Sequence, residues 1–280
     1  MSGEEVLRIK PQEAASLIAE GRMQVVTAAP EQRSGGDPLA ERAREILGKD
    51  FLGIDAVRNL EAKLNGVGQN IEFVVPEAPP IPYTDKDLEL ARQNGEMLIL
   101  RVGSMQKDGR ENPVTLINFR ELFRADPLGR IETPFYSFRP EANDWYKDED
   151  FATRAGEIQL SWALVTKEVL AESKGKNHEK QTEVIKKHAN ELKKKGASNT
   201  DFRRRTPTEA AWDTLLYYVN NEEQLLSGTY DWTNTQSSGG RLVALVTLIR
   251  RVWTGTAGIR AARVTSLVFV SLGSFSTLRP

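Results

Sequence analysis

The chain has 280 residues, of which 39% are hydrophobic, and its 38 Lys and Arg residues nearly balance its 39 Asp and Glu residues. This length allows a sizeable core in one large domain or two small ones, and the balanced charge argues against a globally basic nucleic-acid binder. The absence of cysteine excludes disulfide scaffolds, cysteine-ligated zinc and thiol nucleophiles. Because the only histidines are His178 and His188, we expect no histidine-rich metal site and no cofactor.

The N-terminus has no apolar run typical of a secretory signal. No stretch of about 18 uninterrupted apolar residues occurs, so no membrane-spanning helix is expected. These two features predict a cytoplasmic protein.

Helical spacing of apolar residues predicts short helices at 12–21, 39–48 and 54–65, followed by a brief strand at 71–75. Residues 76–84 form a proline-dense linker that cannot be helical. Thr84, with acidic residues in the turn after it, predicts a helix that ends near Gly95.

A buried strand is expected at 97–102, and residues 113–124 are ambiguous, with a helix favoured. Residues 125–150 should be largely irregular, residues 160–171 form an apolar segment, and a Lys-rich helix fits 180–195. The pattern predicts an α+β protein. We expect an N-terminal helical portion with its linker at 1–82, followed by a domain at 83–280.

Two charged segments are candidates for a binding function. The Lys/Arg cluster at 174–205 is consistent with a nucleic-acid patch, but a solvated helix face is favoured because no aromatic residues are interleaved with it. The acidic run 148–150 lacks the glycines of a calcium loop, which favours a solvated turn. No catalytic constellation and no metal-ligand spacing emerge, so the sequence predicts a protein that is not an enzyme.

The most informative stretch, residues 205–213, reads R-T-P-T-E-A-A-W-D. Thr206 and Glu209 form a capping-box pattern with proline at the first helical position, and Thr208 is the competing N-cap. Trp212, Leu215, Leu216 and Val219 would then share one face of the helix. A turn is expected at 220–221, and loop or turn structure at 230–234 and 237–240.

This stretch resembles the R-L-P-T-E-A-E-W-E signature of formylglycine-generating-enzyme (sulfatase-modifying-factor) domains, and Tyr230-Asp231-Trp232 is similar to their Y-P-W turn. The resemblance implies a C-type-lectin-like fold in the domain at 83–280. Those enzymes work through cysteines, which this chain lacks, so the resemblance implies a scaffold rather than formylglycine generation.

The C-terminal tail has an unusual composition. Residues 241–280 contain six of the 38 basic residues, all Arg, and none of the 39 acidic ones, so the tail carries +6 and the preceding residues carry −7. The tail also lacks Lys, Asn, Gln, His, Met and Tyr. One interpretation is a buried sheet, in which charges are depleted.

The other interpretation comes from a resemblance to the variable proteins of diversity-generating retroelements, which often carry the lectin-like fold. The ending Leu272-Gly273-Ser274-Phe275-Ser276 is similar to their L-G-V-x-F-S close. Adenine-templated change of an Asn codon cannot produce Lys, Glu, Gln, Met or Trp, and the tail holds none of these except Trp253.

The favoured hypothesis is therefore a ligand-binding protein with a hypervariable region at about 240–280, which binds an unknown protein or other macromolecule. The alternative is a nucleic-acid-binding protein that uses the 174–205 segment. The candidate ligand-binding residues of the variable surface are Arg250, Arg251, Trp253, Thr254, Thr256, Arg260, Arg263, Thr265, Ser266, Phe269 and Ser271.

Overall fold

The computed structural model describes residues 37–124, 145–199, 202–226, 230–251 and 263–272, with residues 124, 230, 245–251 and 263–272 described by their backbone alone. The chain divides into two compact units at residues 37 and 38, and the second unit holds nearly all the described residues. The boundary expected at 82/83 lies inside this second unit. The helix predicted at 12–21 lies outside the described residues.

The described elements give an α+β fold, as the sequence predicts. The first half of the unit contains, in order, α2 (Pro38–Leu47), η1 (Gly48–Asp50), β1 (Phe51–Leu52), α3 (Ile54–Asn65), β2 (Ile71–Phe73), α4 (Asp85–Asn94), β3 (Glu96–Arg101), β4 (Ser104–Lys107), β5 (Arg110–Pro113) and α5 (Leu116–Arg124). The second half contains α6 (Asp150–Thr153), β6 (Ser161–Thr166), η3 (Ala171–Ser173), α7 (His178–Lys194), α8 (Pro207–Asn221), β7 (Tyr230–Gln236), β8 (Leu242–Arg251) and β9 (Arg263–Leu272).

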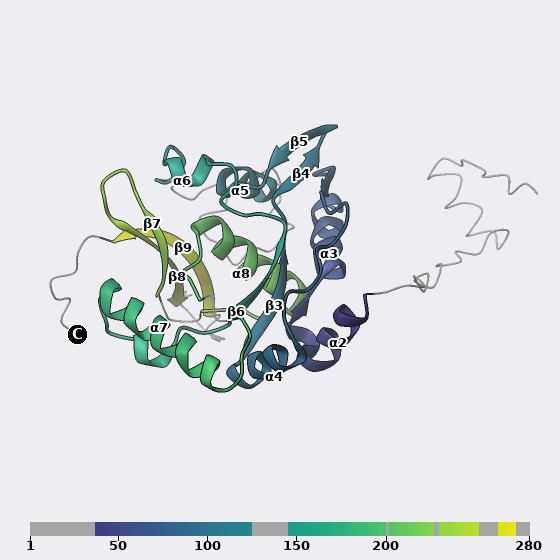
Figure 1. The fold of residues 1–280 in the computed structure, drawn as a ribbon. Coiled ribbons are helices and arrows are strands. Elements are labelled where there is room, and N and C mark those ends of the chain that lie inside the picture. Colours follow the sequence, from purple (N-terminus) through teal and green to yellow (C-terminus); the bar gives the residue numbers. More distant parts are fainter. Residues whose placement is uncertain (1–36, 125–144, 200–201, 227–229, 252–262, 273–280) are drawn as a thin grey trace, which may run out of the picture. The chain divides into compact units, whose positions relative to one another are not determined.

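The strands form three small sheets of three strands each (Figure 1). In the first sheet β3 is central, parallel to β1 and antiparallel to β6. The second sheet, β2-β4-β5, and the third, β7-β8-β9, are entirely antiparallel. The third sheet is built from the compositionally biased tail together with β7.

Local sequence chemistry sets the ends of α4. The Thr84 side chain accepts a hydrogen bond from the Asp87 backbone, and the Asp87 side chain accepts one from the Thr84 backbone, so a capping box starts the helix. Gly95 ends the helix in the left-handed conformation, with φ of 70°. The chain then enters β3, all six residues of which are buried.

Helix α8 is the centre of the fold. It contacts β3 of the first sheet, β7 and β8 of the third sheet, and helices α3, α5 and α6, and Figure 1 shows it between these elements. Twelve of its fifteen residues are buried, including every residue from Pro207 to Tyr217. The sequence predicted a single buried face on this helix. The structure instead encloses α8 on several sides.

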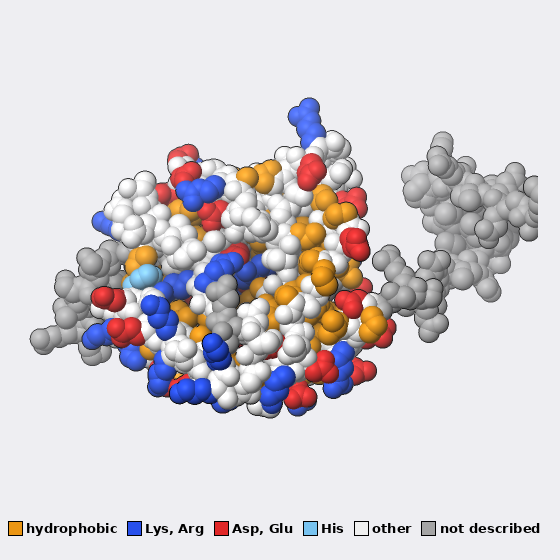
Figure 2. All heavy atoms as spheres, in the orientation of Figure 1, with side chains coloured by type: hydrophobic (Ala, Val, Ile, Leu, Met, Phe, Trp, Pro, Cys, Tyr) orange, Lys and Arg blue, Asp and Glu red, His pale blue; other side chains and the backbone are white. Residues whose placement is uncertain are grey.

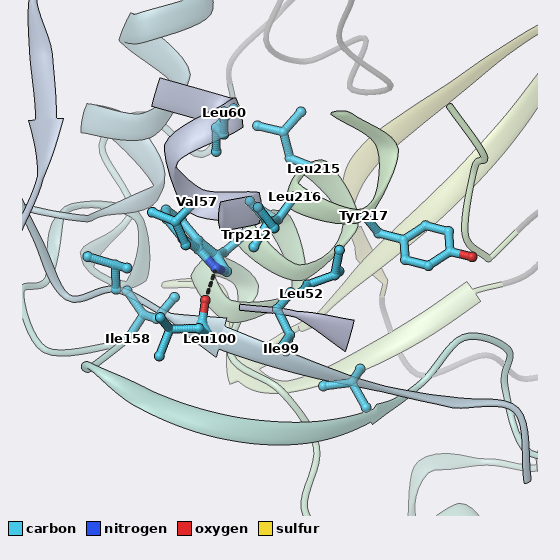
Figure 3. Close-up of a cluster of buried hydrophobic side chains, with 14 of the residues drawn as sticks. Leu52, Val57, Leu60, Ile99, Leu100, Ile158, Trp212, Leu215, Leu216 and Tyr217 are labelled. Carbon is cyan, nitrogen blue, oxygen red and sulfur yellow. Dashed lines mark hydrogen bonds between the residues drawn. The ribbon is translucent and has the colours of Figure 1, made fainter. Parts of the chain in front are cut away.

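Trp212 of α8 holds the core together. Its ring is completely buried, with the Phe73 ring 5.0 Å away edge-on and the Phe119 ring 5.5 Å away. Its indole N–H donates a hydrogen bond of 3.1 Å to the backbone carbonyl of Leu100 in β3, as Figure 3 shows among the surrounding aliphatic side chains. The indole therefore fixes the helix to the central strand with both apolar and polar contacts.

The loop expected at 230–234 is instead part of strand β7. The polar residues that suggested a loop find partners: the Thr233 hydroxyl donates to the Val243 carbonyl at 2.8 Å, and the Asn234 backbone N–H donates to the Arg205 carbonyl at 3.1 Å. The loop prediction rested on the turn-forming residues of the segment itself. It was wrong because the hydrogen-bond partners, Val243 and Arg205, lie outside the segment.

We expect Trp212→Ala to lower the free energy of unfolding by about 3–5 kcal/mol, because the change leaves a cavity and an unpaired carbonyl at Leu100. Trp212→Phe should lower it less, since most of the ring volume remains. Leu39→Ala, at an exposed leucine of α2, is the control. Urea denaturation measures all three, and a loss at Trp212 no larger than that at Leu39 would show that α8 is not central to stability.

Candidate ligand-binding site

The R-T-P-T-E-A-A-W-D stretch forms the start of α8 as predicted. The Thr206 hydroxyl accepts a hydrogen bond of 3.1 Å from the Glu209 backbone N–H, and a Glu209 carboxylate oxygen accepts one of 2.9 Å from the Thr206 backbone N–H. Pro207 occupies the first helical position. The capping box therefore forms at Thr206 rather than at Thr208.

The same Glu209 carboxylate belongs to a buried group of charges. Arg101, at the end of β3, donates two hydrogen bonds to Asp213, of 3.0 and 2.7 Å, and one of 2.6 Å to Glu209. All three side chains are at most 6% exposed. A bidentate guanidinium–carboxylate pair of this kind fixes both distance and orientation between β3 and α8.

Two further arginines extend this group to β7. Arg205 donates to Asp231 of β7 at 2.5 Å and to Asp213 at 3.4 Å, and Arg203 donates to both oxygens of Glu209, at 2.7 and 2.5 Å. We call these six residues the arginine–carboxylate cluster: Arg101, Arg203, Arg205, Glu209, Asp213 and Asp231. Its three positive and three negative charges balance.

The electrostatics of the cluster favour the charged forms of Glu209 and Arg205. Burial by itself raises the pKa of Glu209, but the hydrogen bond from Arg203 and the charge of Arg101 outweigh burial and lower this pKa below its usual value. Burial would lower the pKa of Arg205, but Asp231 and Asp213 outweigh it and raise this pKa. The cluster therefore joins β3, α8 and β7 through compensated charges.

The predicted surface residues fall mainly at one end of the third sheet. β8 and β9 pair in register over ten positions, which sets Arg251 directly opposite Arg263, Arg250 opposite Val264, and Ile249 opposite Thr265. Ser266 pairs with Leu248, Phe269 with Leu245 and Ser271 with Val243, so the last two lie further along the hairpin. Trp253, Thr254, Thr256 and Arg260 belong to the connection between the strands and lie outside the described residues.

Sequence reasoning missed Arg101 and Asp231 as members of the cluster. The available signal was a charged residue, Arg101, at the end of an otherwise apolar run predicted to be a buried strand. Its partners Glu209 and Asp213 follow more than one hundred residues later, at separations of 108 and 112. Asp231 was assigned to a loop, which hid its role.

The acidic run at 148–150 is engaged in local contacts. Glu149 accepts hydrogen bonds from the Ser238 backbone N–H at 2.6 Å and the Ser238 hydroxyl at 2.9 Å, and Asp150 pairs with Arg154. Glu149 therefore ties the start of α6 to the turn between β7 and β8. Within the described ranges, no group of three or more His, Asp or Glu side chains is arranged to hold a metal ion.

A second buried polar pair lies at the other end of β3. Glu96 is 2% exposed, and its Oε1 atom is 3.8 Å from Nε2 of His188 on α7, with no hydrogen bond to either atom. Burial raises the pKa of Glu96 to about 7, and burial lowers the pKa of His188. Near neutral pH this carboxyl group therefore keeps its proton in much of the folded population.

The chain has no significant match among protein-family models, curated proteins or solved structures. In the part of the chain that the structure describes, no helix combines the length and the apolar character needed to cross a membrane.

Arg101→Met should lower the free energy of unfolding by about 3–5 kcal/mol, because Glu209 and Asp213 would lose a shared buried partner. Arg44→Met provides a matched control, since Arg44 pairs with Asp55 at the surface and both side chains are more than half exposed. Urea denaturation of both variants is the measurement. If both variants lost a similar, small amount of unfolding free energy, the cluster would not be a major source of stability.

Glu96→Gln should gain stability relative to the wild type as the pH rises. The folded protein retains a proton on Glu96 that the unfolded chain releases above pH 4.5, so wild-type stability falls through this group between pH 4.5 and about 7. The difference between variant and wild type should widen over that window by roughly 2–3 kcal/mol. Denaturation at several pH values measures it, with Glu111→Gln at an exposed position as the control for carboxylate removal. A difference that is constant with pH would contradict a raised pKa.

Proposed function

We propose that this chain is a non-enzymatic ligand-binding protein that displays a variable C-terminal surface on a C-type-lectin-like scaffold and is diversified by a retroelement. Its ligand is a protein or other macromolecule, bound by the end of the third sheet that leads into residues 252–262. The 205–213 signature and the tail composition motivate the proposal, and features of the fold support it.

The register of β8 and β9 is the observation that supports the proposal most. Five candidate positions lie in the strand halves next to the connection: Arg250, Arg251, Arg263, Thr265 and Ser266. Four more, Trp253, Thr254, Thr256 and Arg260, belong to the connection itself. The backbone register therefore gathers these strand positions at one end of the sheet, and arginine and aromatic residues are common binding hot spots.

A second support is the separation between the interactions that stabilise the fold and the candidate surface. The arginine–carboxylate cluster and Trp212 lie on β3, α8, β7 and the segment before α8, and none of their residues is in the 240–280 region. The strand β8 enters the core at its beginning, where Val243 and Ala244 are buried. A scaffold with this arrangement tolerates substitutions at the far end of the hairpin, as diversification requires.

The nucleic-acid alternative is favoured by one feature, the exposed lysines of the 174–205 segment on and around α7. The arginines at the end of the segment argue against the nucleic-acid alternative, because Arg203 and Arg205 already pair with carboxylates of the cluster. Lys187 is also near Glu172 and Glu191. DNA binding that weakens steeply with salt would favour the alternative over the proposed display function.

Deep sequencing of the 3′ end of the gene and its flanking DNA across a natural population tests the proposal. We expect substitutions confined to codons 240–280 and matched to adenines in a nearby near-repeat. The upstream codons for the cluster provide the internal control and should stay uniform. A uniform tail with no template repeat would remove the diversification mechanism.

A further inference from the structure

A cavity of about 360 Å³ lies beside the arginine–carboxylate cluster, between β6, α7 and the segment 202–205. All six residues of β6 line it, so the cavity runs along this strand. Its remaining lining includes the aromatic and basic side chains Tyr83, His188, Phe202, Arg204 and Trp232. Figure 2 shows basic side chains gathered in the middle of the face above α7. The cavity volume is in the range that binds small organic molecules.

Among the described residues around this cavity, the positive charges exceed the negative charges by one. Arg101, Arg203 and Arg205 also line it, but the three carboxylates of the cluster neutralise them. Arg204 is different, because its hydrogen bonds go only to neutral groups: the Thr182 hydroxyl at 2.8 Å, the His178 carbonyl at 2.9 Å and the Gln181 side-chain oxygen at 3.5 Å. Burial lowers the pKa of Arg204, and the Asp231 charge opposes this only in part.

The neutral partners hold Arg204 in place without consuming its charge. They engage its Nη1 and Nη2 atoms, while Nε makes no hydrogen bond to any residue that the structure describes. A guanidinium group has five N–H donors, so donors remain for an additional acceptor. A half-buried cation with fixed orientation and spare donors is suited to a carboxylate ligand.

The other walls favour a flat apolar body. Phe202 packs edge-on against the His188 ring at 5.2 Å, and Trp232 lies 6.1 Å from the His178 ring. On the edge of β6 away from β3, the Leu164 backbone N–H donates to the Tyr83 hydroxyl at 3.2 Å, which orients a polar group at this wall.

We propose that this cavity binds a small aromatic carboxylate, with its anionic group at Arg204 and its ring beside Phe202 and Trp232. One uncompensated arginine matches one negative charge, whereas a phosphate monoester would bring a second charge with no partner into a partly buried site. The inference is independent of the proposed display function, because the cavity uses no residue of the 240–280 region.

Isothermal titration calorimetry of the full chain tests the proposal with indole-3-acetate as the probe and indole-3-acetamide as its uncharged counterpart. We expect the carboxylate to bind at least about tenfold more tightly than the amide, because a charge-assisted hydrogen bond contributes that much. Arg204→Gln should remove this preference. Arg92→Gln, at an exposed position on α4, should keep it.

The two probes are compared on the wild-type protein. This comparison therefore tests the proposal even if Arg204→Gln fails to fold. Equal affinity for both probes, or no binding of indole-3-acetate, benzoate or phenylacetate at millimolar concentration, would overturn it. Phenyl phosphate binding more tightly than the carboxylates would overturn the assignment of a single-charge ligand. Variation of residues 250–266 should not affect the affinity, which separates this site from the displayed surface.

Discussion

The bidentate pairing of Arg101 with Asp213, shared with Glu209, is the constraint on which the rest of the structure depends. It joins the last residue of the central strand β3 to the first turns of α8 where all three side chains are excluded from water. Such a pair stabilises only when each charge is compensated, and Arg203, Arg205 and Asp231 complete the compensation. The indole hydrogen bond of Trp212 to Leu100 acts beside it on the same strand.

The two proposed functional regions both border this cluster. On one side, Asp231 connects the cluster to β7 and so to the antiparallel sheet that carries the proposed display surface. On the other side, the cluster neutralises three arginines at the wall of the cavity and leaves Arg204 as the unbalanced cation. The same balance of charges therefore supports the hairpin and gives the cavity its preference for one negative charge.

Helix ends could be predicted from the sequence, but the pairing of charges between distant parts of the chain could not. The capping residues Thr84 and Thr206 and the stop at Gly95 were correctly predicted, because each depends on neighbours within one helical turn. Strand β7 and the enclosure of α8 were missed, since both depend on partners distant in the chain. For the site, the tail positions were predicted by composition and resemblance, but Arg101 and Arg204 acquire their roles only through tertiary contacts.

We propose that a fixed scaffold, held by the arginine–carboxylate cluster, carries a hairpin end that is free to vary. Two libraries of the full chain, compared by protease resistance, test it most directly: one randomises Arg250, Arg251, Arg263, Thr265 and Ser266 to polar residues, and the other randomises Arg101, Glu209 and Asp213. We expect most members of the first library to remain folded and few members of the second to do so. Equal losses in both libraries would contradict it, because the hairpin end would then be part of the structural core.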